Sequence, residues 1–239
     1  MNEKLYRLVS WGFDELIWGG DLLGAGNLPE SGPAVFVSNH LGALGPIAVG
    51  ASLPVQLHFW IHADMLDPQL APDYLRRDFL EGQLHLTPPI SSWLAAGISM
   101  IHVPLLRALG GIPVYHTPDG HLTTFQLSVD LLAQGKYILI FPEDPELPMD
   151  AHYQMTPFKK GFARLGEMYF ERTKQILFFY PLAVHAKSLT VRVGKPVRYN
   201  PISSPASERT RIKSLLEQTI HEMYLQALHG EIVQLPLPN

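Results

Sequence analysis

Two adjacent polar residues, Asn39 and His40, follow a short apolar run at residues 34–38. The run predicts a buried strand, and Pro46, at the end of the glycine-rich segment 41–46, is placed to open a helix at its first position. Imidazole exchanges a proton near neutral pH, so a histidine at the end of a strand is suited to act as a general base. His40 is therefore the candidate catalytic residue.

Polar side chains follow two further predicted strands. Ligands of open α/β sheets gather beyond the carboxyl ends of the strands, so residues at such ends are expected to share a pocket. A pair of acids near His40 would orient the imidazole or bind a polar substrate. The residues at these two ends are Tyr115-His116 and Pro142-Glu143-Asp144.

Strands and helices alternate along the chain, which predicts an α/β sheet with helices on its faces. Strands are expected at 34–38, 55–61, 112–115, 137–141, 176–184 and 189–193. Helices are expected at the N-terminus (within 1–20), over 74–80 and 122–134, from Thr156-Pro157 to Tyr169, and at the C-terminus over 205–229.

The chain has 239 residues and 46% hydrophobic content, enough to bury the core of one domain spanning 1–239. No internal repeat or low-complexity tract divides it. Residues 67–89 are polar and rich in proline, which predicts an insertion over the surface.

Charge and composition limit the partners. Only 17% of residues are charged and the net charge is −4, which argues against a nucleic-acid partner. The absence of cysteine excludes disulfides and thiolate catalysis. The start of the chain does not resemble a signal peptide, and no apolar stretch reaches the roughly 18 residues that span a bilayer. We expect a cytoplasmic protein, with peripheral contact to the cytoplasmic face of a membrane as the alternative.

Four blocks, in order, resemble those of a known enzyme family. They are Ser38-Asn39-His40, Gly110-Gly111-Ile112-Pro113-Val114, Phe141-Pro142-Glu143 and Pro157-Phe158-Lys159-Lys160-Gly161. Over roughly residues 30 to 200 the chain resembles the glycerolipid acyltransferases, which include the 1-acylglycerol-3-phosphate acyltransferases.

The resemblance implies a mixed, largely parallel sheet flanked by helices, and an enzyme of lipid metabolism. The donor would be an acyl thioester of CoA or acyl carrier protein, with no metal or other cofactor. His40 would deprotonate the acceptor. An aspartate five residues after the histidine orients it in this family. Substrate-binding groups are implied at Asn39, Gly111, His116, Pro142, Glu143, Lys159 and Lys160.

Three departures from the family pattern change these expectations. Gly45 stands where the orienting aspartate is expected, and His116 where a phosphate-binding arginine is expected. Asp144-Pro145-Glu146 replaces the usual Gly-Thr-Arg. Missing arginines and added acids disfavour a phosphate group, unless Lys159 and Lys160 compensate. We expect a neutral or amine-bearing acceptor rather than glycerol phosphate.

The missing aspartate leaves two roles open for Asp144. It stands at a strand end and is predicted to take over the orienting of His40; alternatively it is a turn residue before Pro145. The function is correspondingly open. The chain is expected to transfer an acyl group to a hydroxyl or amine, or to be an inactive relative that binds acyl chains or lipids. A thioesterase that uses water is a third possibility.

Overall fold

The computed structural model describes residues 3–82, 84–115 and 117–228, which fall into two compact units. The sheet unit comprises the described residues up to Leu57 and from Val129 onward. The middle unit comprises His58–Ser128. That the whole chain folds as one domain stays a prediction.

The sheet unit contains a mixed, largely parallel sheet, which confirms the predicted fold class. Its order is β1-β7-β6-β2-β5, and β8 also pairs with β6. Three pairings are parallel (β1–β7, β2–β6, β2–β5), and β6 is antiparallel to β7 and β8. The strands are β1 (Asp21–Leu23), β2 (Ala34–Ser38), β5 (Tyr137–Ile140), β6 (Phe178–His185), β7 (Thr190–Val193) and β8 (Val197–Arg198).

Strand β2 is central, and its composition explains why. Ala34 to Val37 are fully buried, as expected for a strand covered on both faces. In the parallel register Val37 lies opposite Ile140 of β5 and Pro181 of β6. The carboxyl ends of β2 and β5 therefore meet, and the residues that follow them lie close together.

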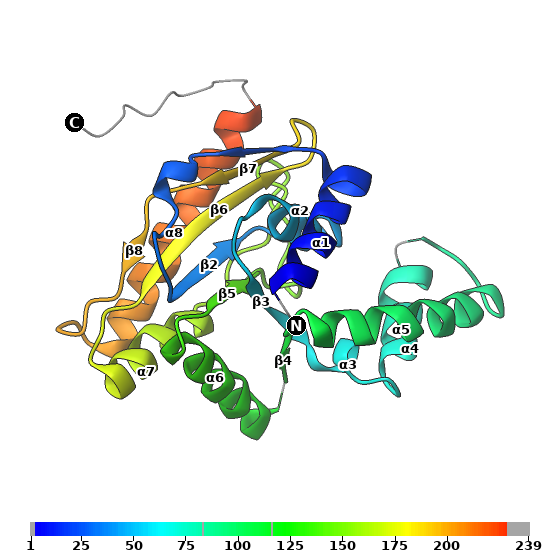
Figure 1. Ribbon diagram of the computed structural model, residues 1–239, viewed down its shortest axis with the longest axis horizontal. Coiled ribbons are helices and arrows are strands. Elements are labelled where there is room, and N and C mark those ends of the chain that lie inside the picture. Colours follow the sequence, from blue (N-terminus) through cyan, green and yellow to red (C-terminus); the bar gives the residue numbers. More distant parts are fainter. Residues whose placement is uncertain (1–2, 83, 116, 229–239) are drawn as a thin grey trace. The chain divides into compact units, whose positions relative to one another are not determined.

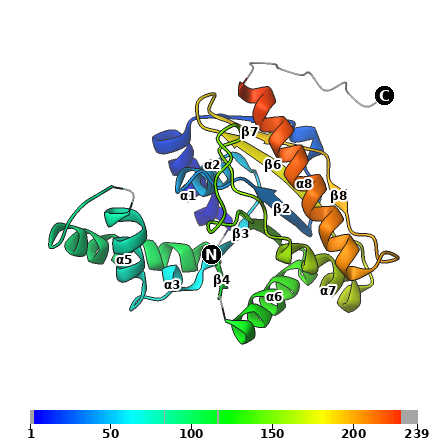
Figure 2. The ribbon, with the colours of Figure 1, turned by 180° about the vertical axis from the view of Figure 1, so that it is seen from behind.

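Helices cover both faces of this sheet (Figures 1 and 2). Helix α8 (Pro205–Leu228) packs on β6, and α1 and α2 lie on the opposite face. The buried residues of α8 recur at helical spacing: Ile212, Leu216, Ile220, Met223 and Tyr224. The other helices are α1 (Glu3–Phe13) with the π-helical turn η1 (Asp14–Trp18), η2 (Ala25–Asn27), α2 (Leu44–Ser52), η4 (Gly161–Ala163) and α7 (Arg164–Thr173).

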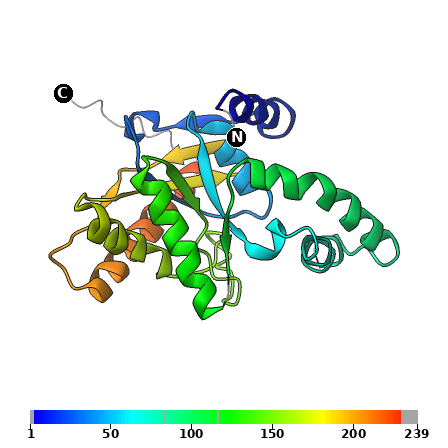
Figure 3. The same cartoon turned by 60° about the horizontal axis from the view of Figure 1, so that its bottom comes forward.

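The middle unit is mostly helical. Strands β3 (Leu57–His62), which begins at the unit boundary, and β4 (Ile112–Val114) pair in parallel. Figure 3 shows the longest helix of this unit, α5, along its length, with the cyan segment of α3 and α4 beside it. The helices are α3 (Ala63–Leu66), α4 (Ala71–Tyr74), η3 (Leu75–Glu81), α5 (Ile90–Ala108) and α6 (Pro118–Ala133), which crosses the boundary.

The helix expected to begin at Thr156-Pro157 begins later. The Thr156 N–H donates to Glu143, and Phe158 forms an antiparallel bridge with Glu143. These bonds hold the segment extended, so helical structure begins only at Gly161. The prediction was wrong because Thr-Pro is an equally good start for a strand-like segment that has a partner.

The expectation that no segment could span a bilayer was also wrong. Helix α5 has 19 residues and is long and apolar enough to cross a membrane by length and composition. Serine, glycine and histidine interrupt its apolar residues, so the sequence shows no unbroken apolar run. Only about a fifth of its most apolar window is buried.

Candidate active site

His40 lies two residues beyond the end of β2, beside the loop that follows β5. Its backbone N–H donates to Oε1 of Glu143 at 2.6 Å. Its ring packs edge-on against Phe141, with ring centroids 5.0 Å apart. The structure therefore joins the two strand ends that the sequence placed in one pocket, and it joins them through the backbone of the histidine.

The chain turns sharply after His40. Leu41 and Gly42 both adopt positive φ, at 46° and 59°, and α2 begins at Leu44. This conformation is costly for leucine and persists only where surrounding contacts enforce it. Strain of this kind concentrates at functional sites, which supports His40 as part of one.

Asn39 fixes the strand end behind the histidine. Its amide nitrogen donates to the Val184 carbonyl at 2.9 Å, and its amide oxygen accepts from the Val184 N–H at 2.8 Å. The side chain is fully buried. Contact between this amide and a substrate, as the sequence predicted, would require β2 and β6 to separate. In the structure this amide joins the end of β2 to β6, and the substrate-binding role of Asn39 stays a prediction.

Glu143 connects two loops of the site. Oε1 binds the His40 N–H, while Oε2 accepts from the Thr156 N–H at 3.0 Å. Bonds to a carboxylate are stronger than bonds between neutral groups, so this bridge holds both segments firmly. Thr156 was missed in the sequence because its role depends on its backbone N–H, which every residue except proline carries.

Asp144 is held by its own loop. Oδ1 pairs with Nζ of Lys159 at 3.1 Å and accepts from the Glu146 N–H at 3.1 Å. Burial opposes ionisation, but the Glu146 N–H and Lys159 hold the pKa of Asp144 below its usual value. Among the described residues, no hydrogen bond joins the imidazole of His40 to a carboxylate. The orienting role of Asp144 stays a prediction.

The surroundings of His40 favour its neutral form. The side chain reaches solvent, yet the protein atoms packed around the ring desolvate it and lower its pKa. The negative charge of Glu143 opposes this shift. A histidine with a lowered pKa is unprotonated at neutral pH, which is the form that accepts a proton.

Gly45 leaves no space for the family aspartate. A Cβ built at this position would overlap the carbonyl oxygen of His40 and lie 2.7 Å from its carbonyl carbon. Any side chain here must displace the backbone of the histidine. The turn that presents His40 therefore requires glycine.

The remaining predicted residues are spread over the chain. The Pro142 carbonyl accepts from the Lys159 N–H at 2.8 Å, close to Glu143 and Asp144. Lys160 is exposed where the loop enters η4. Gly111 belongs to the middle unit, where a Cβ would meet Ile61 and Leu66. His116 lies outside the described residues.

Helix α8 adds residues that the sequence did not single out. Glu217 accepts from the Phe158 N–H at 2.7 Å, and His221 stacks on Tyr153 with centroids 4.0 Å apart. Burial lowers the pKa of His221, and the charges of Glu217, Asp150 and Glu143 oppose this. On the sequence they are simply polar positions of an amphipathic helix, with no signal toward the site.

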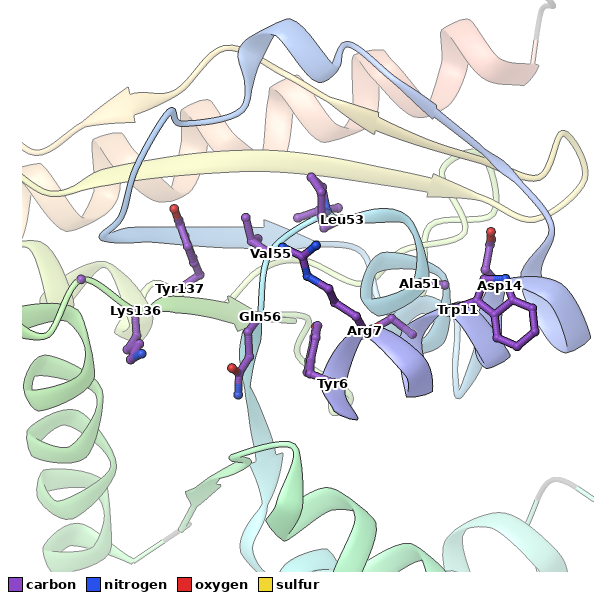
Figure 4. Close-up of a pocket in the computed structure, with 13 residues that line it drawn as sticks. Tyr6, Arg7, Trp11, Asp14, Ala51, Leu53, Val55, Gln56, Lys136 and Tyr137 are labelled. Carbon is purple, nitrogen blue, oxygen red and sulfur yellow. The ribbon is translucent and has the colours of Figure 1, made fainter. Parts of the chain in front are cut away.

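No group of three or more His, Asp or Glu among the described residues is placed to hold a metal ion. The sheet unit also contains a cavity of about 560 Å³ (Figure 4). Its lining includes Tyr6, Arg7 and Trp11 of α1, the 53–56 segment and Tyr137. Since Tyr137 begins β5 and the acids follow its end, this cavity is separate from the candidate site.

The mixed sheet and the helices on its faces form a fold that is shared with a solved acyltransferase. The structure is similar to the crystal structure of the 1-acyl-sn-glycerophosphate (LPA) acyltransferase PlsC from Thermotoga maritima. The TM-score is 0.55 at 13% identity, over 93% of this chain and 83% of that one. By sequence, no family model and no curated protein matches the chain. The similarity therefore concerns the fold.

Proposed function

We propose that the protein transfers a fatty acyl group from a thioester of CoA or acyl carrier protein to a hydroxyl or amine acceptor, working peripherally on the cytoplasmic face of a membrane. The observation that supports this most is His40. It is neutral, desolvated and bonded through its backbone to Glu143, at the end of the central strand of a fold shared with an acyltransferase.

In the proposed reaction the neutral imidazole of His40 removes a proton from the acceptor's hydroxyl or amine. The freed oxygen or nitrogen attacks the thioester carbonyl carbon, and the carbon–sulfur bond breaks. His40 then returns this proton to the departing thiolate. With a hydroxyl or a neutral amine no proton is gained or lost overall, whereas an ammonium acceptor first loses one further proton to solvent. Glu143 holds the backbone of His40 in place during these steps.

The charges of the site support an acceptor without a phosphate group. Glu143, Asp144 and Glu146 occupy one loop, and the charge of Lys159 is engaged by Asp144. Lys160 is then the lysine of this block left to meet an anion. A dianionic headgroup would be repelled by the acids, whereas a neutral hydroxyl or an ammonium-bearing headgroup would not be.

The test is thioester consumption by the wild-type protein, followed by thiol release, with neutral lipid alcohols, amine-bearing headgroups and glycerol 3-phosphate as acceptors. We expect acylated product from the first two classes and little from the third. Thiol release that needs no acceptor would identify a thioesterase. If no thiol is released from either donor with any acceptor of a broad panel, the proposal is contradicted.

The second candidate is a relative that binds acyl chains or lipids without catalysis. Its support is the lack, among the residues described, of a carboxylate bonded to the His40 imidazole. Such a protein would bind a radiolabelled acyl thioester or free fatty acid, and leave it unchanged, in the same assay.

Matched amide substitutions distinguish the roles of Glu143 and Asp144. We expect Glu143→Gln to lower kcat about tenfold or more, because the amide offers one acceptor oxygen and either the His40 N–H or the Thr156 N–H loses its partner. Losing this charge also lowers the pKa of His40 further, so the acid limb of the pH–rate profile moves to lower pH. Asp144→Asn should change kcat only a few-fold, since Asp144 is paired with Lys159. A loss of about 10² in Asp144→Asn alone would instead support its predicted orienting role.

A further inference from the structure

Helix α5 of the middle unit has an inverted arrangement of side chains. Its buried positions are four residues apart and carry small side chains: Ser91, Ala95, Ser99 and Val103. Its exposed positions carry large apolar side chains: Trp93 is 75% exposed, Met100 77% and Ile101 74%. Ile90, Leu94 and Ile98 extend this surface. A helix surrounded by water shows the opposite distribution.

The exposed face, here called the α5 face, carries no formal charge. The sequence from Ile90 to Leu106 contains no Asp, Glu, Lys or Arg, and Arg107 follows in the last turn. Burial lowers the pKa of His102, so this histidine is neutral at physiological pH. At 1.5 Å per residue the helix is about 28 Å long, and the named exposed apolar residues occupy about the first 18 Å of it, from Ile90 to Ile101.

The opposite side of α5 packs on η3, which brings both apolar side chains and one ion pair against it. Ser91 donates to Glu81 at 2.8 Å, and Glu81 pairs with Arg76 at 3.2 Å. Ala95 packs with Leu75 and Leu80 of η3. Placing α5 upright in a bilayer would carry the Arg76–Glu81 pair into hydrocarbon, where desolvation is costly. A helix with an exposed apolar side, whose other side packs on protein that carries an ion pair, suits an orientation parallel to a membrane surface.

We infer that the α5 face is the membrane-contacting surface of this protein, lying in the plane of the bilayer with Trp93, Met100 and Ile101 at the boundary of headgroups and acyl chains. This deepens the membrane contact within the proposed function and does not rest on catalysis.

A second copy of the chain fits the α5 face less well. The large exposed apolar residues of the α5 face lie within its first 12 residues, about 18 Å of helix. A stable protein interface buries about 800 Å² on each partner. Lipid requires no such minimum, since insertion strengthens with whatever apolar area enters the bilayer.

The net charge of the middle unit predicts how membrane binding depends on lipid charge and salt. Residues 58–128 contain six acids and three arginines, so attraction to anionic lipid does not explain binding. We expect the full chain to co-sediment with neutral phosphatidylcholine vesicles, and to do so equally at low and high salt. Binding that needs anionic lipid and disappears in salt would overturn the inference.

The decisive variant is Trp93→Ser/Met100→Ser/Ile101→Ser. Removing three large apolar side chains should weaken vesicle binding at least about 100-fold. These positions are exposed, so the thermal unfolding midpoint should not fall. The matched control is Leu189→Ser/Ile202→Ser/Leu215→Ser, which removes three exposed apolar side chains from the sheet unit and should leave binding unchanged.

Depth and oligomeric state distinguish the other arrangements. Trp93 should be quenched most by lipids brominated near the glycerol end of the acyl chain, a signal that Trp93→Phe removes; strongest quenching at the chain ends would show a spanning helix and overturn the inference. If the wild type does not bind vesicles but forms a dimer, and the triple variant is a monomer, the α5 face is assigned to a second copy.

If vesicle binding is lost in Leu8→Ser/Leu16→Ser and retained in the triple variant of α5, membrane contact is assigned to α1 and η1 instead. None of these measurements uses thioester turnover, so failure of the proposed catalysis and failure of the proposed membrane contact are separate results.

Discussion

Replacing His40 with Gln should lower the rate of acyl transfer by about 10² to 10⁴, the range attributed to a general base. Glutamine fills similar space and leaves the backbone N–H that binds Glu143 in place. It cannot accept the acceptor's proton near neutral pH. The loss should therefore appear in kcat, with thermal unfolding unchanged. In the wild type, the rate should fall as the pH drops through the lowered pKa of His40, so the acid limb lies below pH 6.5.

The control is His121→Gln, the same substitution at an exposed histidine of α6, which should keep full activity. The acid limb of the pH–rate profile should be lost in His40→Gln and retained in His121→Gln. Equal rates in the wild type and His40→Gln would remove His40 from the mechanism and leave the lipid-binding protein as the better description.

The sheet could be predicted because its signals are local. The apolar run of β2 and the continuous run of β5 are long enough to identify buried strands, and alternation with helices predicts parallel pairing. Helix α5 could not be recognised in the same way. Its largest apolar residues face outward and its buried ones are serine, alanine and valine, so its pattern does not follow the usual rule for a helix on a core.

The location of the candidate site could be predicted from the sequence, but most of the hydrogen bonds within it could not. Parallel register brings the ends of β2 and β5 together, so His40 and Glu143 had to be neighbours. Their link runs through a backbone N–H, and so does the link to Thr156. Residue type carries no information about backbone donors. The pairing of Asp144 with Lys159 was not predicted for a different reason: the sequence does not show which side chains of two neighbouring loops meet.

Restoring the family aspartate with Gly45→Asp should damage the protein rather than improve it. A Cβ at position 45 would overlap the His40 carbonyl oxygen, and relief requires moving the backbone that presents the imidazole. We expect unfolding free energy to fall by about 2–4 kcal/mol, measured by urea denaturation. The residual folded protein should lose at least tenfold in activity, because His40 is displaced.

Gly45→Ala isolates the steric effect from the charge and should show most of the same loss of stability. Its matched control is Gly12→Ala in α1, also a helical glycine, where nothing lies within 4 Å of a new Cβ. Alanine favours helix over glycine, so this control should gain up to about 1 kcal/mol. A rate increase in Gly45→Asp would mean that the turn yields to accommodate a carboxylate. Otherwise glycine at 45 is part of how this chain positions its histidine, with Glu143 on the His40 backbone in place of an aspartate on its ring.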